Sequence, residues 1–127
     1  MSRRPSNFIA KAVRKRQPGT MNSLEAAYAQ HLEELRLTGE VVWWAFEPIK
    51  LRLASKTTYN PDFLVIRSNG DVEVHETKGY WRDDARLKIK VAAEYFWFFR
   101  FVAIQQVPKK HGGGWKYEFF GGPDETE

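Results

Sequence analysis

The stretch YNPDFLVIRSNGDVEVHETK, residues 59–78, decides the fold of this chain. Residues 59–66 and 72–78 are rich in β-branched and aromatic side chains, which predicts two β-strands. Between them, the sequence Ser-Asn-Gly-Asp at 68–71 favours a tight turn, because Asn-Gly tolerates the positive φ of a type I′ turn. We therefore expect an antiparallel hairpin here.

On the N-terminal side of this hairpin, the pattern predicts one helix and one further strand. Asn22 or Ser23 caps a helix that runs to about Leu37, where a Thr-Gly pair ends the helical spacing of apolar residues. Residues 41–46 form a short apolar run that favours a strand, and residues 49–54 then alternate between apolar and polar side chains.

On the C-terminal side, a helix is predicted from Asp83 or Asp84 to about Phe98, followed by strands at 101–107 and 115–120. The expected order is α-β-β-β-α-β-β, which predicts an α/β fold with a mixed β-sheet flanked by helices. The strand at 101–107 is expected to lie parallel to the sheet centre, since a helical crossover permits that pairing.

The composition indicates one globular domain at residues 22–121, between a basic arm at 1–21 and an acidic, loose tail at 122–127. A chain of 127 residues with 43% hydrophobic residues is long and apolar enough to bury a core. No cysteine is present, which excludes disulfides and thiolate metal sites. No apolar run approaches the ~20 residues of a membrane span. We expect a cytoplasmic protein, in the host cytoplasm if the chain is phage-encoded.

The net charge of +4 is distributed unevenly. Residues 1–20 carry six basic residues and no acid, whereas the remaining 107 residues hold 14 basic and 16 acidic residues. Such an arm suits the phosphates of DNA or RNA, but a solvated arm that only aids solubility explains the same charges. The basic residues of the arm are Arg3, Arg4, Lys11, Arg14, Lys15 and Arg16.

Two carboxylates and one ammonium group lie at the ends of the two hairpin strands. Strand alternation puts Glu76 and Lys78 on one face with Val72 and Val74, which we expect to face the first helix. Asp62, on the neighbouring strand, is then expected close to Glu76 or Lys78. His75 points to the other face and is interpreted as structural.

This trio is suited to holding a divalent cation against a phosphodiester. Two adjacent carboxylates repel unless a cation lies between them, and Mg²⁺ prefers oxygen ligands. The backbone carbonyl of Thr77 is a candidate further ligand, and Lys78 a charge that orients water or neutralises developing negative charge. The alternative is an ordinary Asp62–Lys78 ion pair with Glu76 solvated.

Other candidate site residues have ordinary structural explanations as well. Glu25 borders the apolar stripe of the first helix and is able to reach the sheet, but Asn22-x-x-Glu25 also matches a capping box. Tyr80 and Trp81 are suited to stacking on a base or, more commonly, to core packing. Three basic residues around the second helix are candidates for phosphate contacts, although a solvated face explains them equally: Arg82, Lys88 and Lys90.

Pro61-Asp62, Glu76-x-Lys78 and a preceding helix bearing Glu25 together resemble the PD-(D/E)xK nuclease superfamily, over residues 22–107. The stretches YNPDFLV, ETKGYW and KIK look like small phage-encoded endonucleases of this superfamily. They are also similar to transposon-end endonucleases and, more distantly, to Holliday-junction resolvases. The resemblance implies a restriction-endonuclease-like sheet, with Asp62 and Glu76 as metal ligands, Lys78 as the catalytic lysine and Glu25 as a catalytic and metal-binding helix carboxylate.

We therefore expect an Mg²⁺-dependent DNA endonuclease, with Mn²⁺ as a substitute, that is phage-related and selective for branched or junction DNA. The resemblance further implies a homodimer, and neither a small-molecule cofactor nor a membrane partner is expected. Alternatives are a non-catalytic nucleic-acid binder on the same fold, a transposon-end or restriction-type endonuclease, or a structural assembly protein. RNA remains open as a substrate.

Overall fold

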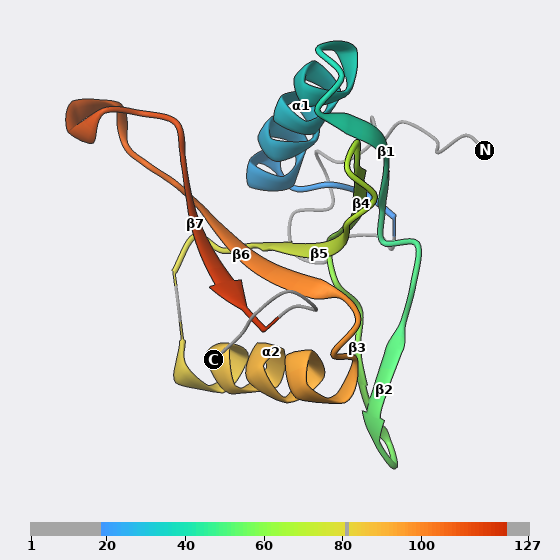
Figure 1. The fold of residues 1–127 in the computed structure, drawn as a ribbon. Coiled ribbons are helices and arrows are strands. Elements are labelled where there is room, and N and C mark those ends of the chain that lie inside the picture. The colour runs from blue at the N-terminus through green and yellow to red at the C-terminus, as the bar shows by residue number, and fades with distance from the viewer. Residues whose placement is uncertain (1–18, 81, 122–127) are drawn as a thin grey trace.

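The computed structural model describes residues 19–80 and 82–121 (Figure 1). Residues 1–18 of the predicted basic arm, Trp81 and the predicted tail at 122–127 lie outside the described residues. The elements are α1 (Ser23–Leu37), β1 (Val41–Phe46), β2 (Leu51–Ala54), β3 (Thr57–Tyr59), β4 (Phe63–Arg67), β5 (Val72–Thr77), α2 (Asp83–Tyr95), β6 (Arg100–Gln106), the short 3₁₀ helix η2 (Lys109–His111) and β7 (Trp115–Phe120).

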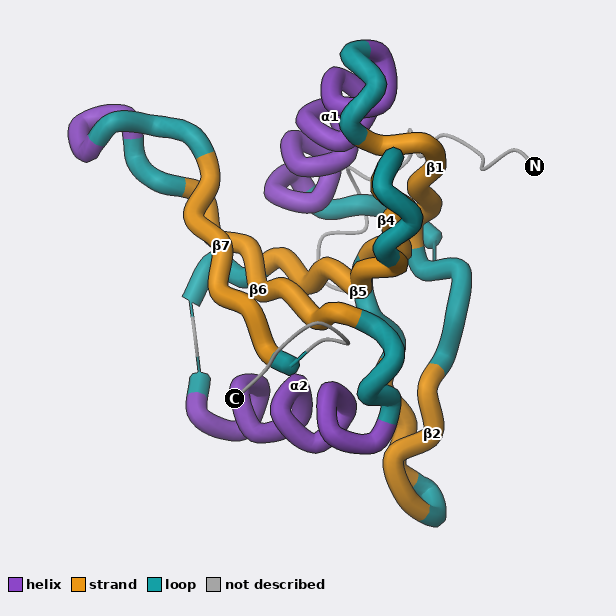
Figure 2. Tube along the Cα trace, in the orientation of Figure 1, coloured by secondary structure: helices purple, strands orange, loops and turns teal. Residues whose placement is uncertain are grey.

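Five strands form a mixed sheet in the order β1-β4-β5-β6-β7 (Figures 1 and 2). The β4–β5 hairpin is antiparallel, β6 runs parallel to β5, and β7 returns antiparallel to β6. The predicted α/β class, the antiparallel hairpin and the parallel strand after α2 are therefore confirmed. The turn differs from type I′, because among residues 67–71 only Gly70 has a positive φ, of 97°.

Five strands, rather than the three expected, precede α2. The predicted strand at 59–66 is divided by Asn60-Pro61-Asp62 into β3 and β4, because Pro61 has no N–H to donate to a ladder. β3 pairs instead with β2, forming a separate two-stranded ribbon with Leu51 opposite Tyr59. This ribbon projects from the main sheet past one end of α2 (Figure 1).

The two helices cover opposite faces of the sheet (Figure 1). On one face, Tyr28 and Leu32 of α1 pack with Phe63 and Val65 of β4. On the other, Ile89 and Ala92 of α2 pack with Val74 of β5 and Phe101 of β6. The prediction that Val74 faces the first helix is therefore wrong: alternation establishes which residues share a face, but both faces of this sheet are covered by a helix.

The helix boundaries follow local capping chemistry. α1 begins after Asn22, as expected, in a capping box with Glu25. α2 ends at Tyr95, three residues before the predicted end, because the backbone of Phe96 leaves the helical region with φ −107° and ψ 59°. None of the helices in the described part of the chain is long and apolar enough to cross a membrane.

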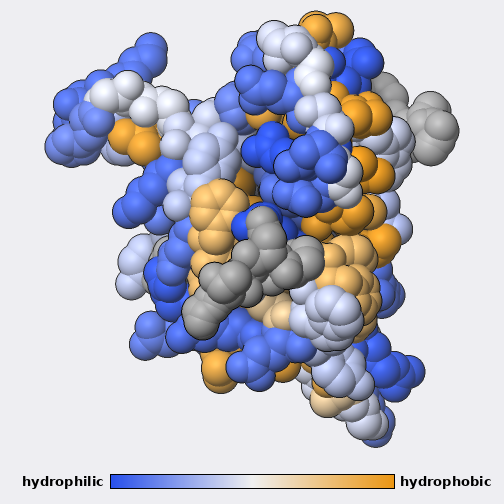
Figure 3. Space-filling view, viewed as in Figure 1, coloured by the Kyte–Doolittle hydropathy of each residue, from blue (hydrophilic) through white to orange (hydrophobic). Residues whose placement is uncertain are grey.

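The surface is chemically uneven in the view of Figure 3. The connection between β6 and β7, which contains η2, is largely hydrophilic, whereas hydrophobic residues gather along the β1 edge of the sheet. Val42 on β1 is 59% exposed and Trp43 is 44% exposed. Edge strand β1 thus contributes exposed apolar area while α1 buries its opposite side.

Candidate active site

The register of the β4–β5 hairpin brings Asp62 next to the end of β5. Phe63 pairs with His75, so Asp62 lies opposite Glu76. Thr77 holds the Asp62 side chain through two hydrogen bonds: its backbone N–H and its hydroxyl both donate to Asp62 Oδ2, at 2.9 and 2.8 Å. Asp62 is buried, and these two hydrogen bonds fix its orientation.

Glu76 is held by donors from two other segments. Its Oε1 accepts from the Tyr59 hydroxyl at 2.9 Å and from the backbone N–H of Asp62 at 3.2 Å. Its Oε2 lies 3.3 Å from Lys78 Nζ. Only 12% of the Glu76 side chain is exposed. The arrangement leaves one oxygen anchored in the protein and the other directed to Lys78.

The surroundings of Glu76 oppose its ionisation. Burial and, to a lesser extent, the charge of Asp62 raise the pKa of the Glu76 carboxyl from 4.5 to about 7, although Lys78 and the Tyr59 hydroxyl oppose the increase. Burial and the adjacent Glu76 charge also raise the pKa of the Tyr59 hydroxyl, which therefore stays a hydrogen-bond donor. A cation placed between the carboxylates would relieve this cost.

Lys78 emerges where β5 ends beside its parallel neighbour. Its backbone N–H donates to the carbonyl of Ile104 on β6 at 2.8 Å, which anchors the residue while its side chain extends to Glu76. The Lys78 side chain is 24% exposed. The alternative of an Asp62–Lys78 pair with a solvated Glu76 does not describe this site, because Glu76 is mostly buried and is itself the partner of Lys78.

Glu25 occupies the capping position that the sequence suggested. Asn22 Oδ1 accepts from the Glu25 backbone N–H at 2.7 Å, and Glu25 Oε1 accepts from the Asn22 backbone N–H at 2.9 Å. Glu25 is buried, on the helix that covers the face opposite Val74. Among residues 19–80 and 82–121, no three His, Cys, Asp or Glu side chains form a metal-holding group, so a catalytic role for Glu25 stays a prediction.

Asp62 and Glu76 nevertheless fit a divalent cation. Mg²⁺ is commonly bound through one or two carboxylates, keeps several waters, and does not require an all-protein cage. The pair offers oxygen ligands only, and Thr77 and Tyr59 fix them in position. Burial and the charge of Asp62 raise the pKa of Glu76, and a bound cation would favour its ionised form. The Thr77 carbonyl stays a predicted further ligand.

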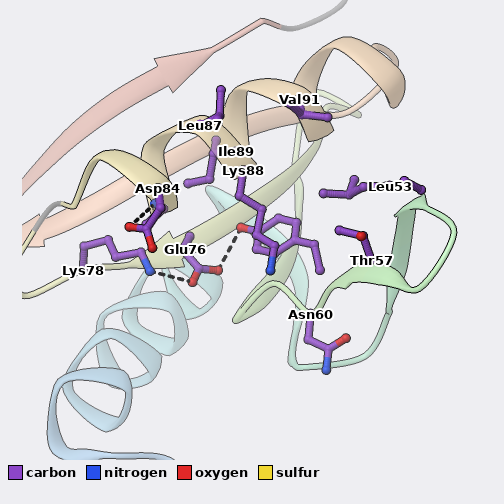
Figure 4. Close-up of a pocket in the computed structure, with 13 residues that line it drawn as sticks. Leu53, Thr57, Asn60, Glu76, Lys78, Asp84, Leu87, Lys88, Ile89 and Val91 are labelled. Carbon is purple, nitrogen blue, oxygen red and sulfur yellow. Dashed lines mark hydrogen bonds and ion pairs between the residues drawn. The ribbon is translucent and has the colours of Figure 1, made fainter.

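A pocket of about 660 Å³ opens beside this trio, between the β2–β3 ribbon and α2 (Figure 4). Lys88 extends from α2 toward Glu76 within it. The pocket was not foreseen from the sequence, because it depends on the division of the predicted strand at Pro61 and on the course of the ribbon. Its lining includes Leu53, Thr57, Glu76, Lys78, Lys88 and Val91.

The predicted phosphate contacts separate into three groups. Lys88 lines the pocket, whereas Arg82 and Lys90 are exposed outside it, and Arg82 forms an ion pair with Asp84 at 3.3 Å. Tyr80 is 78% exposed, so the expectation that it packs in the core is wrong. Trp81 and the six basic residues of the arm lie outside the described residues.

His75 is structural, as alternation predicted. It is buried against α1, where its Nδ1 lies 2.7 Å from the Tyr28 hydroxyl and its Nε2 lies 2.8 Å from Glu73 Oε1. Burial lowers its pKa, which keeps the imidazole neutral near pH 7. Since a carboxylate only accepts, the proton belongs on Nε2, and the Tyr28 hydroxyl donates to Nδ1.

Two residues of the site were missed by the sequence reasoning. Tyr59 holds Glu76, and the Thr77 side chain holds Asp62, yet only the Thr77 carbonyl was considered. The signal available in the sequence was their position beside the acids, because Thr77 directly follows Glu76 and Tyr59 lies three residues before Asp62.

Comparisons with protein-family models, curated proteins and solved structures find no match for this chain. The argument for its function therefore rests on the geometry of Asp62, Glu76 and Lys78.

Proposed function

We propose that this protein is an Mg²⁺-dependent DNA endonuclease with a restriction-endonuclease-like core. The observation that carries the proposal is the buried Asp62–Glu76 pair with Lys78 Nζ 3.3 Å from Glu76. The mixed sheet supports the proposal, because it contains the antiparallel strands β1, β4 and β5 and, after α2, the parallel strand β6. The fold and the site therefore support one function.

Each residue has a separate task in the proposed reaction. Asp62 and Glu76 would hold the cation, which supplies polarisation of the phosphate and a more acidic bound water. Thr77 and Tyr59 keep the two carboxylates in position, so little reorganisation is needed when substrate arrives. Lys78 places a positive charge beside the phosphate, where it stabilises negative charge that develops on the phosphoryl oxygens.

The test is cleavage of plasmid, four-way-junction and flap DNA with Mg²⁺ or Mn²⁺. We expect Asp62→Asn and Lys78→Met each to lower the cleavage rate by at least about 100-fold. The first removes a carboxylate that would hold the cation, and the second removes the positive charge beside the phosphate. Glu34→Gln, an exposed change on α1, is the matched control and should retain the wild-type rate. The proposal fails if the wild type cleaves none of these substrates, or if the two site variants cleave as fast as the control.

Junction selectivity and a homodimer belong to the same proposal. Resolution of a branched molecule requires two strands to be cut, and the described residues of each copy supply one Asp62–Glu76–Lys78 trio. We expect the active species to be a dimer, detectable by light scattering at the enzyme concentrations that give paired cuts. A strictly monomeric active enzyme that only nicks DNA would refute this part while leaving the chemistry of the site intact.

A further inference from the structure

The pocket between α2 and the β2–β3 ribbon has two chemically different ends. At one end lie the charged side chains of Glu76, Lys78 and Lys88, and at the other lie Leu53 from the ribbon and Val91 from α2 (Figure 4). Lys88 and Val91 are three residues apart, so the helix presents both on one face. We call this pocket the α2 groove.

The α2 groove has the size of a site for one small molecule. Its volume of about 660 Å³ lies within the roughly 300–1,000 Å³ of such sites, which is room for one nucleotide. A base inside a duplex is stacked between its neighbours and paired with its partner, so it cannot enter a pocket unless it leaves the duplex. The dimensions therefore favour a single unpaired nucleotide.

The charge of the α2 groove favours an anionic ligand. Lys88 has no hydrogen-bond or ion-pair partner among the described residues, and Figure 4 shows it directed into the groove. Asp84, the acid on the α2 side, already forms an ion pair with Arg82 at 3.3 Å. Glu76 is likewise paired with Lys78, at 3.3 Å. The uncompensated charge in the groove is thus the Lys88 ammonium.

We propose that the α2 groove binds one unpaired nucleotide of the DNA substrate, with its phosphate at Lys88 and its base between Leu53 and Val91. This inference rests on the proposed nuclease function and names its substrate class: DNA with a single-stranded segment next to the cut. The location supports it, because Glu76 and Lys78 line the same groove, so the bound nucleotide lies next to the phosphate to be hydrolysed.

Binding without cleavage tests the proposal. In EDTA, the full chain is titrated with an octamer of thymidylate and with an eight-unit abasic phosphodiester that has the same phosphates but no bases. We expect the thymidylate to bind about tenfold more tightly, since burial of the apolar surface of one base contributes about that factor, and to shift the methyl NMR signals of Leu53 and Val91. Equal affinities, or no shift of these methyl signals, would overturn the proposal.

Two variants separate the two ends of the groove. Lys88→Gln should weaken the binding of both oligomers by about threefold to tenfold, because both carry phosphates. Val91→Ser should weaken only the binding of thymidylate, by a similar factor, because only it has bases. Lys116→Gln, at an exposed lysine on β7 that does not line the groove, is the matched control and should bind like the wild type. Circular dichroism spectra establish that all three variants are folded.

The outcomes distinguish this inference from the nuclease proposal. If the protein cleaves DNA with Mg²⁺ but binds the two oligomers equally, the nuclease function stands and the nucleotide site is refuted. If thymidylate shifts the groove methyl signals but no DNA substrate is cleaved, the nucleotide site stands and the nuclease function is refuted. An effect of Lys116→Gln as large as that of Lys88→Gln would indicate non-specific attraction of phosphates and would refute the groove as a binding site.

Discussion

Glu76 lies in a site that opposes its own ionisation when no cation is bound. Its pKa is raised from 4.5 to about 7, first by burial and then by Asp62. The folded state therefore binds the proton more tightly than the unfolded state does, so the free energy of unfolding falls as pH rises from about 4.5 to about 7. Above that window, the full cost of the buried charge remains.

Replacing Glu76 with Gln should remove this cost. Without metal, we expect Glu76→Gln to be more stable than the wild type above pH 7, by on the order of 3 kcal/mol, and equal to it near pH 4. Urea unfolding in EDTA across this pH range measures the difference. Mg²⁺ should then stabilise the wild type above pH 7 but not the variant. Parallel pH profiles for the two proteins would contradict this account of Glu76.

At the residue scale, the sequence was sufficient for the motif but not for its supports. Asp62, Glu76 and Lys78 were predicted together because a hairpin and strand alternation are local rules. The hydrogen bond from Tyr59 was not predictable in this way, since it depends on where β3, which belongs to the separate ribbon, lies relative to β5. Alternation also could not establish which helix covers Val74, because that choice is made by packing of the whole sheet.

At the element scale, the role of Glu25 on α1 has two alternatives: it only caps the helix, or it caps the helix and also takes part in cleavage. Gln at the same position preserves a capping box but removes the charge. We expect Glu25→Gln to unfold within about 0.5 kcal/mol of the wild type and to cleave DNA at least about tenfold more slowly. Asn22→Ala should show the opposite pattern, losing about 1 kcal/mol of stability with cleavage retained. Wild-type cleavage by Glu25→Gln would leave Glu25 a cap alone.

The predicted boundaries of helices and strands were wrong where the backbone conformation, and not the pattern of side chains, decides where an element ends. Residues 59–66 have the side chains of one strand, but Pro61 cannot donate to a ladder, and the chain forms β3 and β4 instead. That division creates the β2–β3 ribbon and with it one wall of the α2 groove. The second helix was predicted to run to about Phe98, yet α2 ends at Tyr95 and the chain turns before β6.

At the scale of the whole molecule, the proposed function assigns cleavage to the site at the end of β5 and the attraction of DNA to the basic arm. The mixed sheet buries both faces under helices, so the carboxylates meet solvent only at the end of β5, next to the α2 groove. Beside the Lys88 ammonium in the groove, this site carries the carboxylates of Asp62 and Glu76, which repel phosphates. A separate source of positive charge is therefore needed to attract DNA, and we expect the six basic residues of the arm to supply it.

Neutralising the arm should change how DNA binding depends on salt. Each phosphate contact contributes about 0.9 to the slope of log affinity against log salt concentration, so converting the six basic arm residues to Gln should reduce that slope by up to about 5. The full-length variant keeps the chain length and the catalytic trio, and cleavage at saturating DNA should match the wild type. The measurement is DNA binding in EDTA between 50 and 200 mM salt. An unchanged slope would mean that the arm is only solvated, and that phosphate attraction comes from the folded domain, where Lys88 and Lys90 are the next candidates.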